Sequence, residues 1–210
     1  MQCVKDAQRS QPGGSGPHGI DPGTTERLRA FAALLLRWNA AINLVGRGDA
    51  DVLWSRHVVD SLRLLPLVPA ETPFATDLGS GAGFPGLVLA VATGIPFALV
   101  ESDRRKAAFL REAARVTAAP VSVHAVRIEA ASLAPAPLVT ARALAPLPRL
   151  LELARPLVAP GGVCLFPKGA AAAAEIAEAR RQGWTFALAA HEDPESPDSA
   201  VLRLSDIHHA

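Results

Sequence analysis

Cysteine is scarce in this chain, with two residues, Cys3 and Cys164, among 210. Two cysteines without metal-ligand spacing exclude a disulfide framework and a cysteine-based metal site. No apolar run approaches the ~20 residues that span a bilayer, and the first residues lack the apolar stretch of a signal peptide. The formal net charge is only +1, so bulk charge does not indicate a nucleic-acid partner. We therefore expect a cytoplasmic monomer that binds neither a metal nor a membrane.

Half of the residues are apolar, which is enough for a large core. A length of 210 residues fits one main domain with a small additional element. Residues 1–23 are rich in glycine, proline, serine and glutamine, as is typical of a disordered tail. Residues 24–70 hold two stretches with apolar side chains at helical spacing, 24–38 and 52–65, and Thr24 or Thr25 can cap the first. They predict an N-terminal helical element before the main domain, residues 71–210.

From Phe74 onward, short apolar stretches alternate with helical patterns. The expected strands are 74–78, 96–101, 121–125, 138–142, 161–166, 184–190 and 200–204, and the expected helices are 85–93, 103–118, 147–157 and 170–182. This alternation predicts a parallel sheet with helices on both faces. The last two strands are joined by the polar segment 192–198 and should form an antiparallel pair at the sheet edge. The fold class is therefore α/β, with a seven-stranded, mostly parallel sheet.

The most informative segment is residues 76–86, Thr-Asp-Leu-Gly-Ser-Gly-Ala-Gly-Phe-Pro-Gly. It predicts the end of a strand, a turn that contains Gly79, Gly81 and Gly83, and a helix with Pro85 at its first position. Such a turn brings main-chain N–H groups close to a ligand. A purely structural turn is the alternative.

Two carboxylates near the turn indicate which ligand it binds. Glu101 ends the next expected strand, 22 residues after Gly79, where an acid accepts hydrogen bonds from a ribose. Asp77 is expected beside the ligand, where it repels a pyrophosphate and attracts a sulfonium or an ammonium group. S-adenosylmethionine carries both cations and no phosphate, so charge favours it over NAD. An NAD-linked oxidoreductase and a non-catalytic RNA-binding protein stay open as alternatives.

Further polar residues follow strands at the same rim of the predicted sheet, where ligands bind. Arg142 is a candidate for the cofactor carboxylate, for guanine O6, or for a salt bridge to Glu129. Lys168 is either a phosphate contact or a solvated loop lysine. The run Arg104-Arg105-Lys106 begins a helix, where cations are unfavourable, so either an RNA backbone or a plain exposed face explains it.

Two features of the helical element suggest chemistry but favour structural interpretations. His57 and Asp60 stand three residues apart, and such a pair can perform acid–base chemistry. A polar cluster that fixes the helices onto the sheet explains them better. Trp38 and Trp54 can stack on bases, but their helical spacing favours core packing.

Seven motifs occur in the order known from one family. Over residues 24–204 the chain resembles the RsmG (formerly GidB) family of bacterial 16S rRNA guanine-N7 methyltransferases. The matching motifs are Trp38-Asn39 with Asn43-Leu44, Arg56-His57-Val58-Val59-Asp60-Ser61, the run from Asp77 to Gly86, Glu101-Ser102 with Arg105-Lys106 and Phe109-Leu110, Arg127-Ile128-Glu129, Ala141-Arg142-Ala143, and Pro167-Lys168-Gly169. Two positions depart mildly, since Phe84 stands where Leu is frequent and Glu101 where Asp is frequent.

The resemblance implies a class I S-adenosylmethionine-dependent methyltransferase fold with an N-terminal helical extension. It implies methyl transfer to N7 of guanine 527 in the 530 loop of 16S rRNA; a methyltransferase of another substrate is the alternative. By matching position it implies that the cofactor binds Gly79, Phe84, Ile128, Glu129 and Arg142, to which the pattern of the residues adds Asp77, Gly81, Gly83 and Glu101. Guanine N7 has an in-plane lone pair, so we expect alignment alone and no catalytic side chain. The expected RNA-binding residues are Arg104, Arg105, Lys106 and Lys168.

Overall fold

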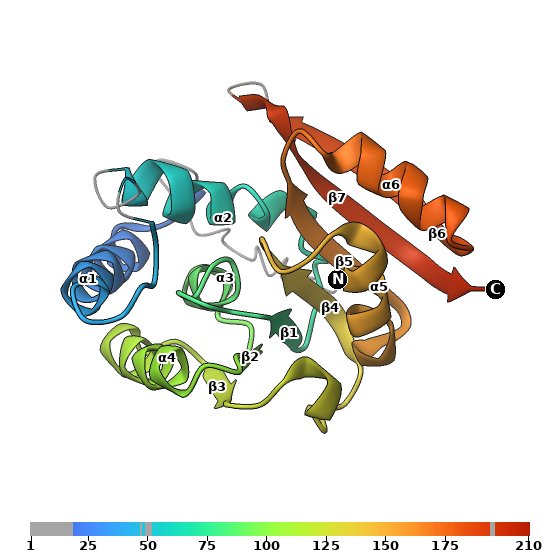
Figure 1. Ribbon diagram of the computed structural model, residues 1–210. Coiled ribbons are helices and arrows are strands. Elements are labelled where there is room, and N and C mark those ends of the chain that lie inside the picture. The colour runs from blue at the N-terminus through green and yellow to red at the C-terminus, as the bar shows by residue number, and fades with distance from the viewer. Residues whose placement is uncertain (1–18, 47, 49–51, 194–195) are drawn as a thin grey trace, which may run out of the picture.

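The computed structural model describes residues 19–46, 48, 52–193 and 196–210 (Figure 1). Most of the predicted tail, residues 1–18, therefore lies outside the described part of the chain. The described residues form a central sheet with helices on both faces, as expected for an α/β fold. Among them, no helix combines the length and the apolar character that crossing a bilayer requires.

Seven strands form one sheet, in the spatial order β3-β2-β1-β4-β5-β7-β6. The strands are β1 (Ala75–Leu78), β2 (Phe97–Val100), β3 (Val121–His124), β4 (Ala136–Ala141), β5 (Val158–Lys168), β6 (Trp184–Asp193) and β7 (Ser196–His209). Neighbours from β3 to β5 are parallel, while β7 runs antiparallel to both β5 and β6. The predicted mostly parallel sheet with an antiparallel pair at its edge is confirmed.

The predicted loop 192–198 is wrong over most of its length. Strand β6 continues to Asp193 and β7 begins at Ser196, so most of this polar segment belongs to the two strands. Glu192 is paired with Ala200 across the hairpin and is exposed. Strand pairing satisfies the main chain whether the side chain is polar or apolar, provided that a polar side chain faces water.

Six α-helices flank the sheet in the described chain: α1 (Pro22–Asn39), α2 (Asp60–Leu62), α3 (Gly86–Thr93), α4 (Arg104–Thr117), α5 (Leu147–Ala154) and α6 (Ala172–Arg181). A π-helical turn, Trp54–Val59, runs directly into α2. Figure 1 shows α1 to α4 on one side of the sheet and α5 with α6 on the other. The predicted helix 52–65 is thus a composite of a π-helical turn and a short α-helix.

The start of α1 differs from the prediction. Asp21, and neither threonine, caps the helix, because its carboxylate accepts hydrogen bonds from the main-chain N–H and the hydroxyl of Thr24. Pro22 follows at the first helical position, which suits its fixed φ. The Asp-Pro pair is a stronger start signal than a threonine inside the first turn. Pro85, expected at the first position of α3, instead immediately precedes that helix, which begins at Gly86.

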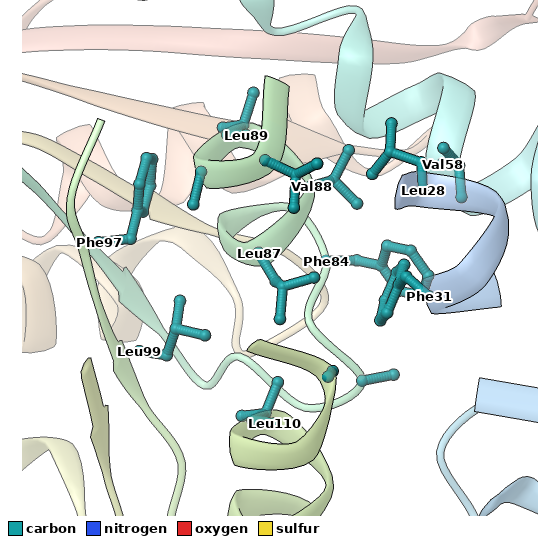
Figure 2. Packing of buried hydrophobic residues seen from close by; sticks show 14 of the residues in the cluster. Leu28, Phe31, Val58, Phe84, Leu87, Val88, Leu89, Phe97, Leu99 and Leu110 are labelled. Carbon is teal, nitrogen blue, oxygen red and sulfur yellow. The ribbon is translucent and has the colours of Figure 1, made fainter. Parts of the chain in front are cut away.

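The N-terminal helices share a core with the helices that flank the sheet. Phe31 of α1 meets the ring of Phe84 edge-on, with 5.4 Å between ring centres, and Figure 2 shows both rings beside Leu87 and Leu110. Trp38 contacts Phe109 of α4 at 5.7 Å, and Trp54 packs against the same cluster. The predicted core role of both tryptophans is confirmed, and α1 is held firmly against the wall of the candidate site.

Candidate functional site

The glycine turn leaves β1 in a conformation that side chains rarely adopt. Gly79 has φ +64° and Gly81 has φ +54°, both in the left-handed region. A Cβ on Gly79 would lie 2.6 Å from Cδ1 of Leu144, whereas the nearest atom to a Cβ on Gly81 is the Gly79 carbonyl oxygen at 3.7 Å. The turn therefore packs tightly against Leu144 on one side and leaves open space beside Gly81.

Glu101, at the end of β2, fixes the turn. Its Oε2 accepts a hydrogen bond of 2.9 Å from the main-chain N–H of Gly81, and its Oε1 accepts one of 2.7 Å from the N–H of Asp103. The side chain is nearly buried but still lines the cavity beside the turn. Each carboxylate oxygen accepts more than one hydrogen bond, so this structural role is compatible with the predicted contact to a ribose.

A cavity of about 690 Å³ opens along the turn at the carboxyl ends of β1, β2 and β4. It brings together seven of the predicted cofactor-binding residues, which are Gly79, Gly81, Phe84, Glu101, Ile128, Glu129 and Arg142. Lys106, predicted to bind RNA, also lines it. The cavity is large enough for a nucleoside cofactor, and its open glycine turn and carboxylate suit the ribose end of such a group.

Asp77 does not line this cavity, contrary to the prediction. The side chain is completely buried beneath the turn, where Oδ1 accepts a hydrogen bond of 2.6 Å from the Thr140 hydroxyl and Oδ2 has no hydrogen-bond partner among the described residues. Burial raises the pKa of the Asp77 carboxyl to about 6, against the opposing effect of the Thr140 hydrogen bond. Asp77 therefore supports the turn from below and joins β1 to β4.

Gly83 also turns away from the cavity. A Cβ at this position would lie 3.2 Å from Leu87, 3.3 Å from Phe31 and 3.4 Å from Leu110. These are core side chains of three helices, so the glycine allows α1 to approach the start of α3. The structure thus gives Gly83 a packing role, and its cofactor contact stays a prediction.

Arg142, just after β4, is held by two aromatic rings. Its Nη2 lies 2.9 Å from Nδ1 of His57, and its guanidinium carbon lies 4.9 Å from the centre of the Phe84 ring. The His57 and Phe84 rings stack at 5.1 Å. The predicted role of the polar cluster around His57, fixing the helical element onto the sheet, is thus confirmed, and His57 joins the cavity wall. Glu129, the alternative partner considered for Arg142, forms an ion pair with Arg149 at 2.6 Å.

Comparison with known proteins identifies the family. The family model described as rRNA small subunit methyltransferase G matches residues 24–193. The chain belongs to this family. A protein named "Ribosomal RNA small subunit methyltransferase G" from Gluconobacter oxydans is 55% identical over 184 residues, covering 88% of this chain and 94% of its own. One of the same name from Rhodospirillum centenum is 54% identical over 190 residues, covering 90% and 87%.

The fold is also found in solved structures. A ribosomal protein L11 methylase from Lactobacillus delbrueckii subsp. bulgaricus superposes with a TM-score of 0.56 at 13% identity, covering 69% of this chain and 75% of its own. The expected class I methyltransferase fold and the resemblance to the RsmG family are both confirmed.

Lys168 in this member of the rRNA small subunit methyltransferase G family is not a solvated loop lysine, while its phosphate contact stays a prediction. Its ammonium group donates 2.7 Å hydrogen bonds to the Ala145 carbonyl and to Oε2 of Glu175, and its side chain is only 11% exposed. The same Oε2 accepts from the N–H of Leu147 at the start of α5. Lys168 therefore ties β5, α5 and α6 together, a pairing that depends on where α6 lies.

The run Arg104-Arg105-Lys106 has its own anion in the fold. Asp103 caps α4 by accepting hydrogen bonds from the N–H groups of Arg105 and Lys106. These main-chain hydrogen bonds lower the pKa of the Asp103 carboxyl. The helix start thus has a negative charge of its own. The three cations at the start of α4 therefore do not need RNA to supply one.

A second cavity of about 360 Å³ adjoins the first, and Arg142 lines both. Its walls come from the helical element, the ends of β4 and β5, and the β6–β7 pair. Asp60 and Arg63 line it from the helical element, while Ala200 and Val201 line it from β7. No motif in the sequence predicts this cavity, because its walls come from separate segments of the chain.

Proposed function

We propose that this protein transfers a methyl group from S-adenosylmethionine to N7 of a guanine in 16S rRNA, guanine 527 of the 530 loop. The proposal rests on one observation above all. The match to the rRNA small subunit methyltransferase G family covers residues 24–193, which include every residue that lines the cavity beside the glycine turn. Family membership favours methyl transfer over hydride transfer to or from NAD, and the ribosome as partner favours action in the cytoplasm.

The residues around the glycine turn suit the cofactor. Gly79 and Gly81 let it approach the main chain, Glu101 accepts a hydrogen bond from its ribose, and Ile128 with Glu129 forms another part of the cavity wall. Arg142 carries a permanent positive charge, which suits a carboxylate such as that of the methionine moiety. When bound, S-adenosylmethionine supplies an electrophilic methyl group that guanine N7 takes with its lone pair as the carbon–sulfur bond breaks.

No proton leaves N7 during this transfer, so the chain needs no general base. The protein instead contributes alignment, which can supply about 7–11 kcal/mol. His57 and Phe84 hold the Arg142 guanidinium between the two cavities, and Asp77 with Thr140 fixes β4 against β1. These side chains position others and exchange no proton with the substrate.

The test is to map modified nucleotides in 16S rRNA by mass spectrometry, comparing a strain that lacks the gene with one that carries it. Loss of a single N7-methylguanosine in the 530 loop, restored by the gene, is the expected result. Unchanged rRNA would overturn the proposed substrate. Calorimetry with S-adenosylmethionine and with NAD tests the cofactor separately, and only the first should bind.

A further inference from the structure

The second cavity lies where a substrate of the proposed reaction must approach. It shares Arg142 with the cofactor cavity and opens at the carboxyl ends of β4 and β5. Pro66, Leu67, Pro167 and Val201 provide apolar surface. Charged side chains besides Arg142 are Asp60, Arg63, Lys168 and Glu192. Enzymes that modify a base extrude it into such a pocket, with apolar side chains against the ring and polar groups at its Watson–Crick edge.

We propose that this cavity receives the target guanine, and that Asp60 accepts hydrogen bonds from its N1–H and N2–H groups. The inference rests on the proposed function, because it names how the substrate of the same reaction is held. The second cavity would thus bind one nucleobase, and Asp60 would determine the specificity for guanine.

Hydrogen-bonding chemistry matches Asp60 to guanine. The Watson–Crick edge of guanine has two adjacent donors, and an ionised carboxylate has only acceptors, arranged to accept both. Adenine has an acceptor at N1, which a carboxylate repels. Asp60 also forms an ion pair with Arg63 through Oδ1 at 3.0 Å. A carboxylate offers about four acceptor positions, so the base shares it with the partners that Asp60 has within the protein.

The position of Asp60 favours it over the other carboxylate of the cavity, Glu192. Asp60 begins α2, directly after the π-helical turn that carries His57, and it lines the second cavity together with Arg142. Because Nδ1 of His57 contacts Arg142, Asp60 lies on the wall near the junction of the two cavities. Glu192 lies instead near the end of β6, on the exposed hairpin.

The charge of the product supports the same assignment. Methylation at N7 makes the purine ring cationic, so a carboxylate at the Watson–Crick edge is favoured as the reaction proceeds. A guanidinium at O6, beside N7, would oppose that charge. Asp60 therefore binds the base, and Arg142 binds the carboxylate of the cofactor.

The experiment compares guanine with inosine, which lacks only the 2-amino group and keeps N7. Reconstituted 30S subunits carry either base at the methylated position of 16S rRNA, and kcat/KM is measured with radiolabelled S-adenosylmethionine. Wild type should prefer guanine by roughly 10- to 100-fold, the effect of losing one hydrogen bond to a charged acceptor. Asp60→Asn should lower kcat/KM on guanine and reduce this preference to less than about threefold.

Two matched variants isolate the contact. Arg63→Gln breaks the same ion pair but leaves the carboxylate, so it should keep the preference for guanine. Glu192→Gln should also keep it. The assignment of Asp60 would be overturned if either of these variants lost the preference for guanine over inosine while Asp60→Asn kept it. Wild type that methylates both bases equally would overturn the contact to the 2-amino group.

Filling the cavity tests the site itself. Ala200→Leu adds bulk inside the second cavity, and Ala187→Leu adds the same bulk on the exposed part of β6. Ala200→Leu should lose at least about 10-fold in kcat/KM for 30S subunits, with unchanged calorimetric affinity for S-adenosylmethionine, whereas Ala187→Leu should match wild type. Full activity of Ala200→Leu would overturn the site. Absence of rRNA methylation by wild type would instead overturn the proposed function.

Discussion

His57 Nδ1 lies 2.9 Å from Nη2 of Arg142, although the two residues are 85 positions apart in the chain. Arginine has no acceptor, so Nδ1 of the histidine must accept this hydrogen bond. The His57 ring also stacks on Phe84, over which the guanidinium lies. The N-terminal helical element thus sets the direction of the charged group between the two cavities.

We expect His57→Phe to weaken cofactor binding, because the variant keeps the stack on Phe84 but loses the acceptor. The loss should be about 1–2 kcal/mol, or roughly 5- to 30-fold in Kd for S-adenosylmethionine by calorimetry. His57→Asn restores an acceptor near Nδ1 and should recover part of that loss. Equal affinity in wild type and His57→Phe would show that Arg142 keeps its position without the histidine.

Asp77 makes stability depend on pH in an unusual direction for a carboxylate. Burial raises its pKa to about 6 from 3.8, so the folded protein holds the proton more tightly than the unfolded chain. This contribution to stability is fully present below pH ~4 and is lost as pH rises through ~6. The shift corresponds to about 3 kcal/mol.

The measurement is urea unfolding of wild type and Asp77→Asn from pH 4 to pH 7.5. Subtracting the two free energies of unfolding removes the contributions of the other carboxylates. Wild type should lose up to about 3 kcal/mol relative to the variant between pH 4 and pH 6.5. A difference that stays constant with pH would mean that the buried carboxyl titrates as it does in the unfolded chain.

Gly86 should tolerate no side chain. A Cβ there would lie 2.5 Å from Cβ and 2.6 Å from Cγ of Asp77. Gly86→Ala should therefore lower the free energy of unfolding by about 1–3 kcal/mol through overpacking. Gly48→Ala is the matched control, since a Cβ at Gly48 meets no atom of the described residues within 4 Å. Equal thermal midpoints for the two variants would contradict this account.

Lys168 should matter for stability, because it is one partner of a largely buried ion pair. Removing one partner of a largely buried ion pair leaves the other uncompensated, so Lys168→Met should cost about 3 kcal/mol in chemical unfolding. Lys168→Met combined with Glu175→Gln should recover part of that loss. A smaller salt dependence of RNA binding in Lys168→Met, without loss of stability, would support a contact between Lys168 and an RNA phosphate.

The run Arg104-Arg105-Lys106 stays a predicted RNA contact, and salt dependence measures it. Each phosphate contact to a single strand contributes about 0.7 to the slope of log K against log salt. The triple alanine variant should therefore lower the slope by up to about 2. A charge-matched control replaces Arg29, Arg37 and Arg115, which line neither cavity, and should leave the slope unchanged.

Hydrophobic periodicity was sufficient to predict the order and type of most elements. The glycine turn and Glu101 were also predictable, because their spacing along the chain reflects a local strand–turn–helix unit. Asp21 as the cap of α1 carried a usable signal in the Asp-Pro pair. These features depend on residues that are neighbours in sequence, where propensity and spacing act directly.

How deeply a side chain is buried, and which side chains of separate elements contact one another, were not predictable from local spacing. Asp77 adjoins the turn in sequence, but only the packing of Gly86 against it shows that it lies beneath the turn. The pairing of Lys168 with Glu175 depends on how α6 packs beside α5. The contact of His57 with Arg142 depends on how the helical element docks. Such contacts follow from the tertiary arrangement, which the pattern of residues along one chain does not specify.

The position of β7 between β5 and β6 has a consequence for synthesis on the ribosome. Strand β6 is made first, yet it has no place in the sheet until β7 has been made and has paired with both neighbours. This side of the sheet is therefore completed only after β7 has been made. Because Ala200 and Val201 of β7 line the second cavity, a nascent chain that already has its glycine turn and helical element still lacks one wall of that cavity.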